Sequence, residues 1–131
     1  MTSERILVTG ADGYIGGMVC DRLLANTDAQ LLLWVRSNDA EEFARKQAQL
    51  EQKYAAQRAR IEIHTGNLYG DAPFATLNPL QVDRIVHAAA VTAFNVKEDV
   101  ANAVNREGTR KMLAFARQCP QLRRFCYVST A

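Results

Sequence analysis

Several features that mark particular protein classes are missing from this sequence of 131 residues. No apolar run approaches the roughly 20 residues that a membrane-spanning helix needs, so we expect no membrane span. The three cysteines, Cys20, Cys119 and Cys126, are far apart and include no C-x-x-C pair, which predicts reduced thiols in or near a core rather than a disulfide framework. The two histidines, His64 and His87, have no partners at ligand spacing, so we expect no metal site.

A strong excess of one charge is also missing. Sixteen basic and fourteen acidic side chains give a formal charge of +2, which does not favour nucleic acid or an anionic membrane as the partner. The N-terminal residues lead directly into the first predicted strand and leave no room for a signal peptide, so we expect a cytoplasmic protein. The hydrophobic fraction of 48% is ordinary for a packed globular chain, and the length predicts one domain over residues 1–131.

Strands and helices are predicted to alternate along the chain, because short apolar runs alternate with segments of helical periodicity. The predicted strands are Arg5–Thr9, Gln30–Val35, Arg60–Thr65, Arg84–Ala88 and Phe125–Ser129. The predicted helices are Tyr14–Ala25, Glu41–Arg60 and Glu98–Gln118. Glycine and proline between the third and fourth strands predict a loop there. This order favours right-handed crossovers, and therefore a doubly wound α/β (Rossmann) fold with a mostly parallel sheet of about five strands.

A glycine-rich segment joins the first predicted strand to the first predicted helix. It reads Thr9-Gly10-Ala11-Asp12-Gly13-Tyr14-Ile15-Gly16-Gly17. Gly10 allows a tight turn, Gly13 leaves room for a pyrophosphate to approach the backbone, and Gly16 lets the helix pack closely on the strand. The N–H groups of the helix N-terminus favour a bound phosphate. The pattern therefore predicts a dinucleotide site, the alternative being a glycine-rich turn without a ligand.

The end of the second predicted strand bears on the choice between NAD and NADP. An acidic residue here accepts a hydrogen bond from the ribose 2′-hydroxyl of NAD, whereas an arginine accommodates the 2′-phosphate of NADP. The sequence has Trp34-Val35-Arg36-Ser37, with no acid at the strand end. The planar guanidinium of Arg36 can pair with phosphate oxygens, and Ser37 can add a hydroxyl contact. We therefore favour NADP(H) over NAD(H), the alternative being that Arg36 is an exposed arginine at a strand edge.

The glycine spacing resembles that of the extended short-chain dehydrogenase/reductase superfamily. Three later segments narrow the resemblance: Val86-His87-Ala88-Ala89-Ala90-Val91-Thr92-Ala93-Phe94, Val104-Asn105-Arg106-Glu107-Gly108-Thr109 and Tyr127-Val128-Ser129-Thr130-Ala131. With Arg36 and the long helix, they are similar to the male-sterility, or thioester-reductase-like, branch. That branch contains fatty acyl reductases and the reductase domains of carboxylic acid reductases and peptide synthetases. Sugar epimerases and steroid dehydrogenases share much of the same pattern.

The resemblance implies that one group of residues holds the adenosine and phosphate half of the dinucleotide. The residues against the pyrophosphate would be Gly10, Gly13, Tyr14, Ile15 and Gly16. Arg36 would bind the 2′-phosphate. Asn67-Leu68 matches the position where the family usually has Asp-Leu beside the adenine, and asparagine keeps an acceptor oxygen there.

A second group would lie at the nicotinamide half. Ala88, Ala89 and Ala90 would leave room for the nicotinamide ribose, and Asn105 would brace the neighbouring backbone through its amide. Tight strand packing is the alternative for the alanines, and an ordinary polar helix position is the alternative for Asn105. Ser129, at the end of the fifth strand, is placed with the cofactor-binding residues.

The catalytic group implied by the resemblance is only partly present. Hydride transfer to a carbonyl needs a donor that neutralises the developing alkoxide. In the family this is a Ser or Thr after the fifth strand, with a Tyr-x-x-x-Lys pair on the next helix. Thr130 matches the hydroxyl position, but no tyrosine is followed by lysine at that spacing. We therefore expect that the chain is the N-terminal part of a longer enzyme, with the C-terminal part of the family fold absent, and that it is inactive alone.

The function that the resemblance implies is an NADPH-dependent reductase of an acyl thioester, either a small molecule or carrier-bound, which yields an aldehyde or alcohol. One alternative is an NAD(P)-dependent sugar epimerase or hydroxysteroid-type dehydrogenase. A non-catalytic dinucleotide-binding module is another. The open sheet edge after the fifth strand also predicts possible self-association.

Overall fold

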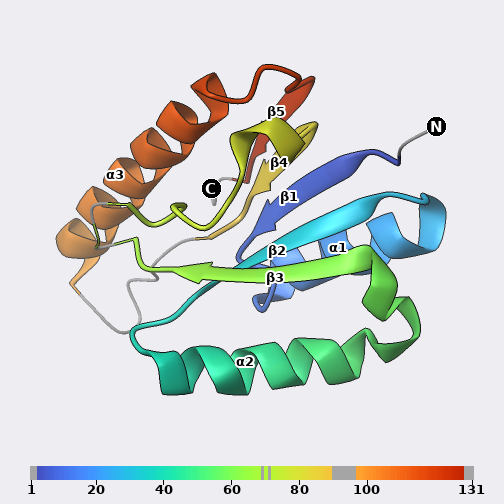
Figure 1. Ribbon diagram of the computed structural model, residues 1–131. Helices are drawn as coiled ribbons and strands as arrows, with labels where there is room; N and C mark the ends of the chain where they lie inside the picture. The colour runs from blue at the N-terminus through green and yellow to red at the C-terminus, as the bar shows by residue number, and fades with distance from the viewer. Residues whose placement is uncertain (1–2, 69, 71, 90–96, 129–131) are drawn as a thin grey trace.

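The protein is a parallel β-sheet covered by helices on both faces, as in the computed structural model of Figure 1, which describes residues 3–68, 70, 72–89 and 97–128. The elements in chain order are β1 (Arg5–Thr9), α1 (Tyr14–Asn26), β2 (Gln30–Arg36), α2 (Ala40–Lys53), the 3₁₀ segment η1 (Ala55–Arg60), β3 (Ile61–Gly66), η2 (Pro79–Gln81), β4 (Arg84–His87), α3 (Glu98–Arg117) and β5 (Arg124–Tyr127). Among the described residues, no helix combines the length and the apolar character needed to cross a membrane.

The five strands run parallel in the order β3-β2-β1-β4-β5. The chain moves outward from β1 to β3 and then returns to place β4 on the other side of β1. In sheets of this kind, ligands bind at the carboxyl ends of the strands where the order reverses. Here that point lies between β1 and β4. The predicted doubly wound Rossmann fold is confirmed.

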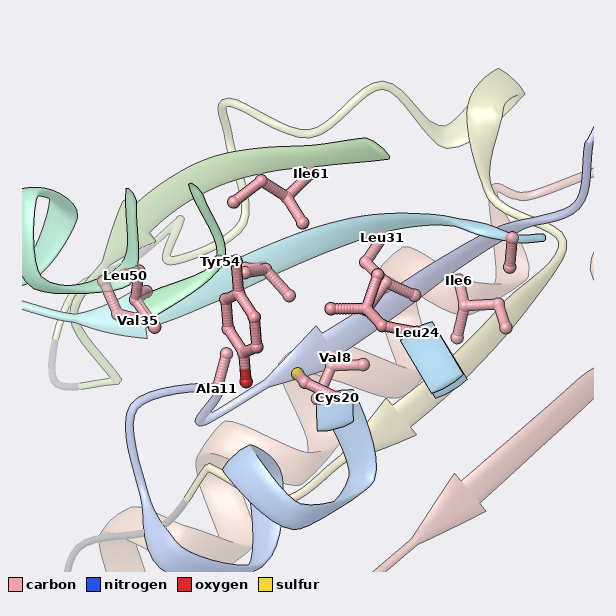
Figure 2. Packing of buried hydrophobic residues seen from close by; sticks show 12 residues of the cluster. Ile6, Val8, Ala11, Cys20, Leu24, Leu31, Val35, Leu50, Tyr54 and Ile61 are labelled. Atoms are coloured by element: carbon pink, nitrogen blue, oxygen red, sulfur yellow. The ribbon is translucent and has the colours of Figure 1, made fainter. Parts of the chain in front are cut away.

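The two faces of the sheet have separate cores, because side chains alternate between faces along each strand. Ile6 and Val8 of β1 pack with Leu31 and Leu33 of β2 against Cys20 of α1, and Figure 2 shows this cluster. On the opposite face, Leu7, Leu32 and Trp34 pack against α3 and the loop over 72–82. The apolar runs of β1 and β2 are therefore buried on both sides, as expected for central parallel strands.

The helix predicted over 41–60 is confirmed for its first thirteen residues and is wrong beyond them. The α-helix ends at Lys53, and η1 follows as a separate 3₁₀ segment. Between them, Tyr54 has non-helical φ/ψ of −109° and 32°, is buried, and donates a hydrogen bond of 2.7 Å to Asp21 of α1. The guanidinium of Arg60 donates to the carbonyl oxygens of Leu24 and Thr27, at the C-terminal end of α1. These contacts with α1 override the local helix propensity of an Ala- and Gln-rich segment.

The outer strand β5 differs from expectation in the exposure of its cysteine. Cys20 and Cys119 are buried as predicted, but Cys126 is exposed rather than in or near the core. It lies on β5, which is the outer strand of the sheet next to β4 and, in the described part of the chain, carries mostly exposed residues. Pairing of this edge with a second copy stays a prediction.

Candidate functional site

The turn after β1 is built around Gly10, which has a φ of +73° that side chains rarely adopt. The N–H groups of Gly10 and Ala11 donate to the carbonyl oxygen of Trp34, at 2.8 and 3.3 Å, so the turn crosses the end of β2. A Cβ on Gly10 would lie 2.9 Å from the backbone nitrogen of Ala89. The turn is therefore in direct backbone contact with the residues that follow β4.

Helix α1 begins immediately after this turn and packs against it. A Cβ on Gly16 would lie 2.0 Å from the carbonyl oxygen of Gly10, a distance that no side chain tolerates. The N-cap residue Gly13 provides no side-chain cap, and the first turn of α1 has no acidic residue. The positive end of the helix dipole is therefore not neutralised by a capping side chain, which suits an anionic ligand.

A hollow of about 180 Å³ lies beside this turn, at the carboxyl ends of β1, β2 and β4. The residues around it are Gly10, Asp12, Gly13, Arg36, Lys46, Leu68, Ala88 and Ala89. Six of these eight were predicted as site residues from the sequence. The hollow coincides with the point where the strand order reverses, so the fold and the predicted residues indicate the same place.

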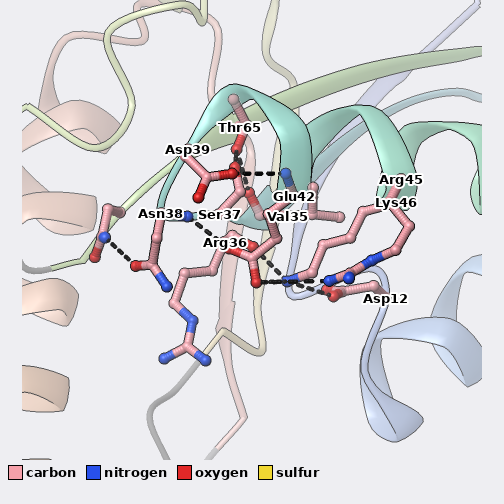
Figure 3. Close-up of polar contacts among 11 residues, drawn as sticks. Asp12, Val35, Arg36, Ser37, Asn38, Asp39, Glu42, Arg45, Lys46 and Thr65 are labelled. Carbon is pink, nitrogen blue, oxygen red and sulfur yellow. Dashed lines mark hydrogen bonds and ion pairs between the residues drawn. The ribbon is translucent and has the colours of Figure 1, made fainter.

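Two cations border the hollow, and sequence reasoning found only Arg36. Lys46 of α2 lies 3.2 Å from Asp12 and donates a hydrogen bond to the carbonyl oxygen of Arg36 (Figure 3). In Figure 3 the guanidinium of Arg36 extends away from this pair, and within the described ranges it has no ion pair or hydrogen bond. The charge of Arg36 is therefore available to an anionic ligand.

A signal for Lys46 is present in the sequence. Asp39 is the N-cap of α2: its side chain accepts from the amide of Glu42, and the Glu42 side chain accepts from the amide of Asn38, the residue before the cap. These bonds fix where α2 begins, shortly after β2. Lys46 follows Glu42 by four residues, on the same side of the helix, so a basic side chain there returns toward the end of β2.

The other residues predicted for the adenosine half take different positions relative to the hollow. Leu68 lines it and is buried, while Asn67 donates to the side chain of Asn38. Ser37 is buried, and its hydroxyl is hydrogen-bonded to Thr65 rather than directed into the hollow. Tyr14 is 82% exposed and lies outside the hollow's lining.

A second, larger hollow of about 620 Å³ lies on the other side of Ala88 and Ala89. Ile15 of α1, Asn105 of α3 and Tyr127 of β5 line it, together with other residues of α3. Ala88 and Ala89 therefore border both hollows. The predicted residues Ala90, Ser129 and Thr130 lie outside the described residues.

His87, the last residue of β4, is buried directly beneath this boundary. Its Nδ1 lies 2.7 Å from the hydroxyl of Thr9, and its ring stacks on Tyr127 with centroids 6.0 Å apart. Burial lowers the pKa of His87 from 6.5 to about 4. The imidazole is therefore neutral at neutral pH, as expected for a structural histidine without a charged partner.

The comparisons with known proteins agree with this geometry. The NAD-binding family model described as "Male sterility protein" matches residues 8–131. The Drosophila melanogaster protein "Fatty acyl-CoA reductase wat" is 26% identical over 96% of this chain and 27% of its own length. The crystal structure of a non-ribosomal peptide synthetase reductase domain from Mycobacterium tuberculosis superposes with a TM-score of 0.72, at 26% identity, over 99% of this chain and 34% of that one.

A UDP-glucuronic acid 4-epimerase from Bacillus cereus, solved with NAD, shares the fold with a TM-score of 0.69 at 22% identity, over 97% of this chain and 40% of that one. The fold and site thus define a dinucleotide-binding domain of the extended short-chain dehydrogenase/reductase type. The chain belongs to the male sterility protein family and resembles fatty acyl-CoA and peptide-synthetase reductases. It spans less than half the length of each of these matched proteins.

The two neighbouring glycines at the start of α1 give a matched test of the packing. Gly16→Ala places a Cβ against the Gly10 carbonyl, and we expect a loss of about 3 kcal/mol of stability or failure to fold. Gly17→Ala meets the flexible end of Lys53 at 3.4 Å and the carbonyl oxygen of Ala11 at 3.7 Å, both ordinary contacts, so it should be neutral or stabilise the helix by about 0.5–1 kcal/mol. Urea unfolding of both variants measures this. Equal losses at the two positions would contradict the packing described.

The buried His87 predicts a pH dependence of stability. Between pH 6.5 and about 4 the unfolded chain binds a proton at this histidine and the folded chain does not. The free energy of unfolding should therefore fall by about 3 kcal/mol as pH decreases through this interval, with no contribution from His87 above it. Urea unfolding at several pH values measures the slope, and His87→Phe corrects for carboxylates that titrate in the same range. Parallel curves for the two proteins would contradict the prediction.

Proposed function

We propose that this chain is the NADPH-binding part of a reductase that acts on acyl thioesters. The observation that carries the cofactor choice is the pair of cations, Arg36 and Lys46, at the carboxyl end of β2 beside the glycine turn. The end of β2 carries Arg36 and Ser37 and no acid that could accept from a ribose 2′-hydroxyl; Asp39 caps α2, and Asp12 is paired with Lys46. A 2′-phosphate between the guanidinium of Arg36 and the ammonium of Lys46 would receive charge-assisted hydrogen bonds from both.

The rest of the dinucleotide would extend from these cations across the glycine turn. The pyrophosphate would lie at the N-terminus of α1, against Gly10 and Gly13, and the adenine near Asn67 and Leu68. The nicotinamide end would pass Ala88 and Ala89 into the larger hollow. The fit is supported by the N-terminus of α1, which has neither a side-chain cap nor an acidic residue in its first turn, and by the hollow beside Gly10 and Gly13.

NADPH and NADH differ only in the 2′-phosphate, so variants of the two cations test the assignment. We expect Arg36→Ala to weaken NADPH binding tenfold to about a hundredfold and to leave NADH binding nearly unchanged, because hydrogen bonds to charged groups contribute about 1.5–3 kcal/mol. Lys46→Gln should have a smaller effect in the same direction, since its charge is shared with Asp12. Titration calorimetry with both nucleotides gives the constants.

Arg45→Ala is the matched control for these two variants. It removes one positive charge from the same helix, at a side chain that is 66% exposed and does not line the hollow. NADPH binding should stay within about twofold of the wild-type value, as expected for a screened surface charge. Equal affinity of the unmodified chain for NADPH and NADH would contradict the role given to Arg36.

The proposed reaction transfers hydride from NADPH to the carbonyl carbon of an acyl thioester. With one proton, this gives the thiol, NADP⁺ and the aldehyde, and a second equivalent of NADPH and a proton would reduce the aldehyde to the alcohol. The names of the matched fatty acyl-CoA and peptide-synthetase reductases support this substrate class. Thr130 is the proposed hydroxyl donor from within this sequence. We place the protein in the cytoplasm, where NADPH and acyl thioesters are available.

Incubating the native gene product with NADPH and a long-chain acyl-CoA tests the substrate class. We expect loss of NADPH together with formation of aldehyde or alcohol, detected by mass spectrometry. Conversion of a UDP-sugar with NAD instead would favour the epimerase alternative, which shares the fold. Tight dinucleotide binding with no turnover of either substrate would favour a non-catalytic module.

A further inference from the structure

The hydroxyl of Thr9 joins β1 to the backbone that leaves β4. Its oxygen lies 3.1 Å from the amide nitrogen of Ala88, 3.2 Å from the amide nitrogen of Ala89 and 2.7 Å from Nδ1 of His87. Thr9 is 0% and His87 1% exposed. A hydroxyl group buried this deeply needs protein partners for its oxygen and for its proton.

These three contacts determine the direction of each hydrogen bond. The two amide N–H groups can only donate, so the Thr9 hydroxyl oxygen accepts from both, and the Ala88 amide is shared with the backbone carbonyl oxygen of Thr9 at 3.2 Å. The hydroxyl proton is then left for the imidazole, and Nδ1 of His87 must accept it. A proton on Nδ1 would direct three donors at one oxygen and leave the hydroxyl proton with no acceptor among the residues that the structure describes. The geometry therefore assigns the neutral imidazole with its proton on Nε2.

The peptide held in this way forms the boundary between the two hollows. Ala88 and Ala89 line both of them. The back of the same peptide contacts the glycine turn, since a Cβ on Gly10 would lie 3.0 Å from the carbonyl carbon of Ala88. A shift of the Ala88–Ala89 peptide would change the passage between the smaller and the larger hollow. Arg36 and Lys46, in contrast, lie on the opposite side of the turn, at β2 and α2.

We propose that His87 is a positioning residue for the nicotinamide half of the dinucleotide. It accepts the Thr9 hydroxyl proton and so fixes the Ala88–Ala89 peptide at the boundary of the two hollows. The identity of the ligand rests on the proposed function, but the hydrogen-bond arrangement does not. Aromatic rings of Phe74 and Tyr127 pack around the imidazole, so a phenyl ring can replace it in shape.

Two variants separate the hydrogen bond from the packing. His87→Phe keeps a ring in the aromatic cluster and removes the acceptor, whereas His87→Asn keeps an acceptor oxygen near the position of Nδ1. We expect His87→Phe to weaken NADPH binding about tenfold. Adenosine 2′,5′-bisphosphate, which lacks the nicotinamide half, should bind both variants and the wild type alike. His87→Asn should restore NADPH binding to within about threefold of wild type.

Two measurements on the protein without ligand test the same hydrogen-bond arrangement. The ¹⁵N shifts of the His87 ring in the wild-type chain report the tautomer, and we expect an unprotonated Nδ1 and a protonated Nε2. Amide hydrogen exchange at Ala89 should be faster in His87→Phe than in the wild type, and slow again in His87→Asn.

Each outcome decides between the proposal and a purely structural role. A proton on Nδ1, unchanged exchange at Ala89, or an equal loss of both ligands in His87→Phe would overturn it. If the wild type binds neither NADPH nor the bisphosphate, the proposed function fails, and the tautomer and the exchange at Ala89 still decide the arrangement around Thr9. If His87→Phe does not fold, the wild-type tautomer and the His87→Asn data remain as the test.

Discussion

The contact between the glycine turn and the end of β4 is the constraint on which the site depends. Gly10 adopts a φ of +73° and brings its backbone against Ala88 and Ala89, with no space for a Cβ. Gly16 packs on the carbonyl of Gly10 from the other side. β1, α1 and β4 therefore meet at one point, and the N-terminus of α1 is held beside the sheet edge where the strand order reverses. The hollow exists because three backbones meet here without side chains between them.

The positively charged side chains of the site come from a different part of the chain, namely β2 and α2. Arg36 ends β2, and Lys46 comes from α2, whose start is fixed by the N-cap Asp39 and its bond from the amide of Glu42. Lys46 also holds Asp12 of the glycine turn and the carbonyl of Arg36, so the β2–α2 connection and the turn are joined through one ammonium group. Three donors allow Lys46 to keep both contacts and still donate to a ligand. Cofactor choice is thus separable from the glycine turn that makes a dinucleotide site possible.

Much of the fold was predictable from the sequence because its signals are local. Apolar runs buried on both faces define β1 and β2, and the glycine spacing defines the turn between β1 and α1. The end of α2 was not predictable, since it depends on Tyr54 and Arg60 reaching α1, contacts that span more than thirty residues. Lys46 was overlooked because it lies on a helix with a polar composition, where a basic residue is ordinarily solvated. Its role follows from the cap that fixes where α2 begins, taken together with the direction of α2 relative to β2.

Ala88 and Ala89 separate the site into two hollows whose linings differ. On the β2 side, two cations and the helix N-terminus suit phosphates, and the hollow is small, at about 180 Å³. On the β5 side, the hollow reaches about 620 Å³ and combines apolar side chains such as Ile15 and Leu113 with the arginines Arg106 and Arg110 of α3. Under the proposed function, changes on β2 or α2 should therefore alter which dinucleotide binds, and changes on α3 or β5 should alter which substrate is accepted. The Ala88–Ala89 peptide borders both hollows, so the support proposed for it from Thr9 and His87 would act at the boundary between them.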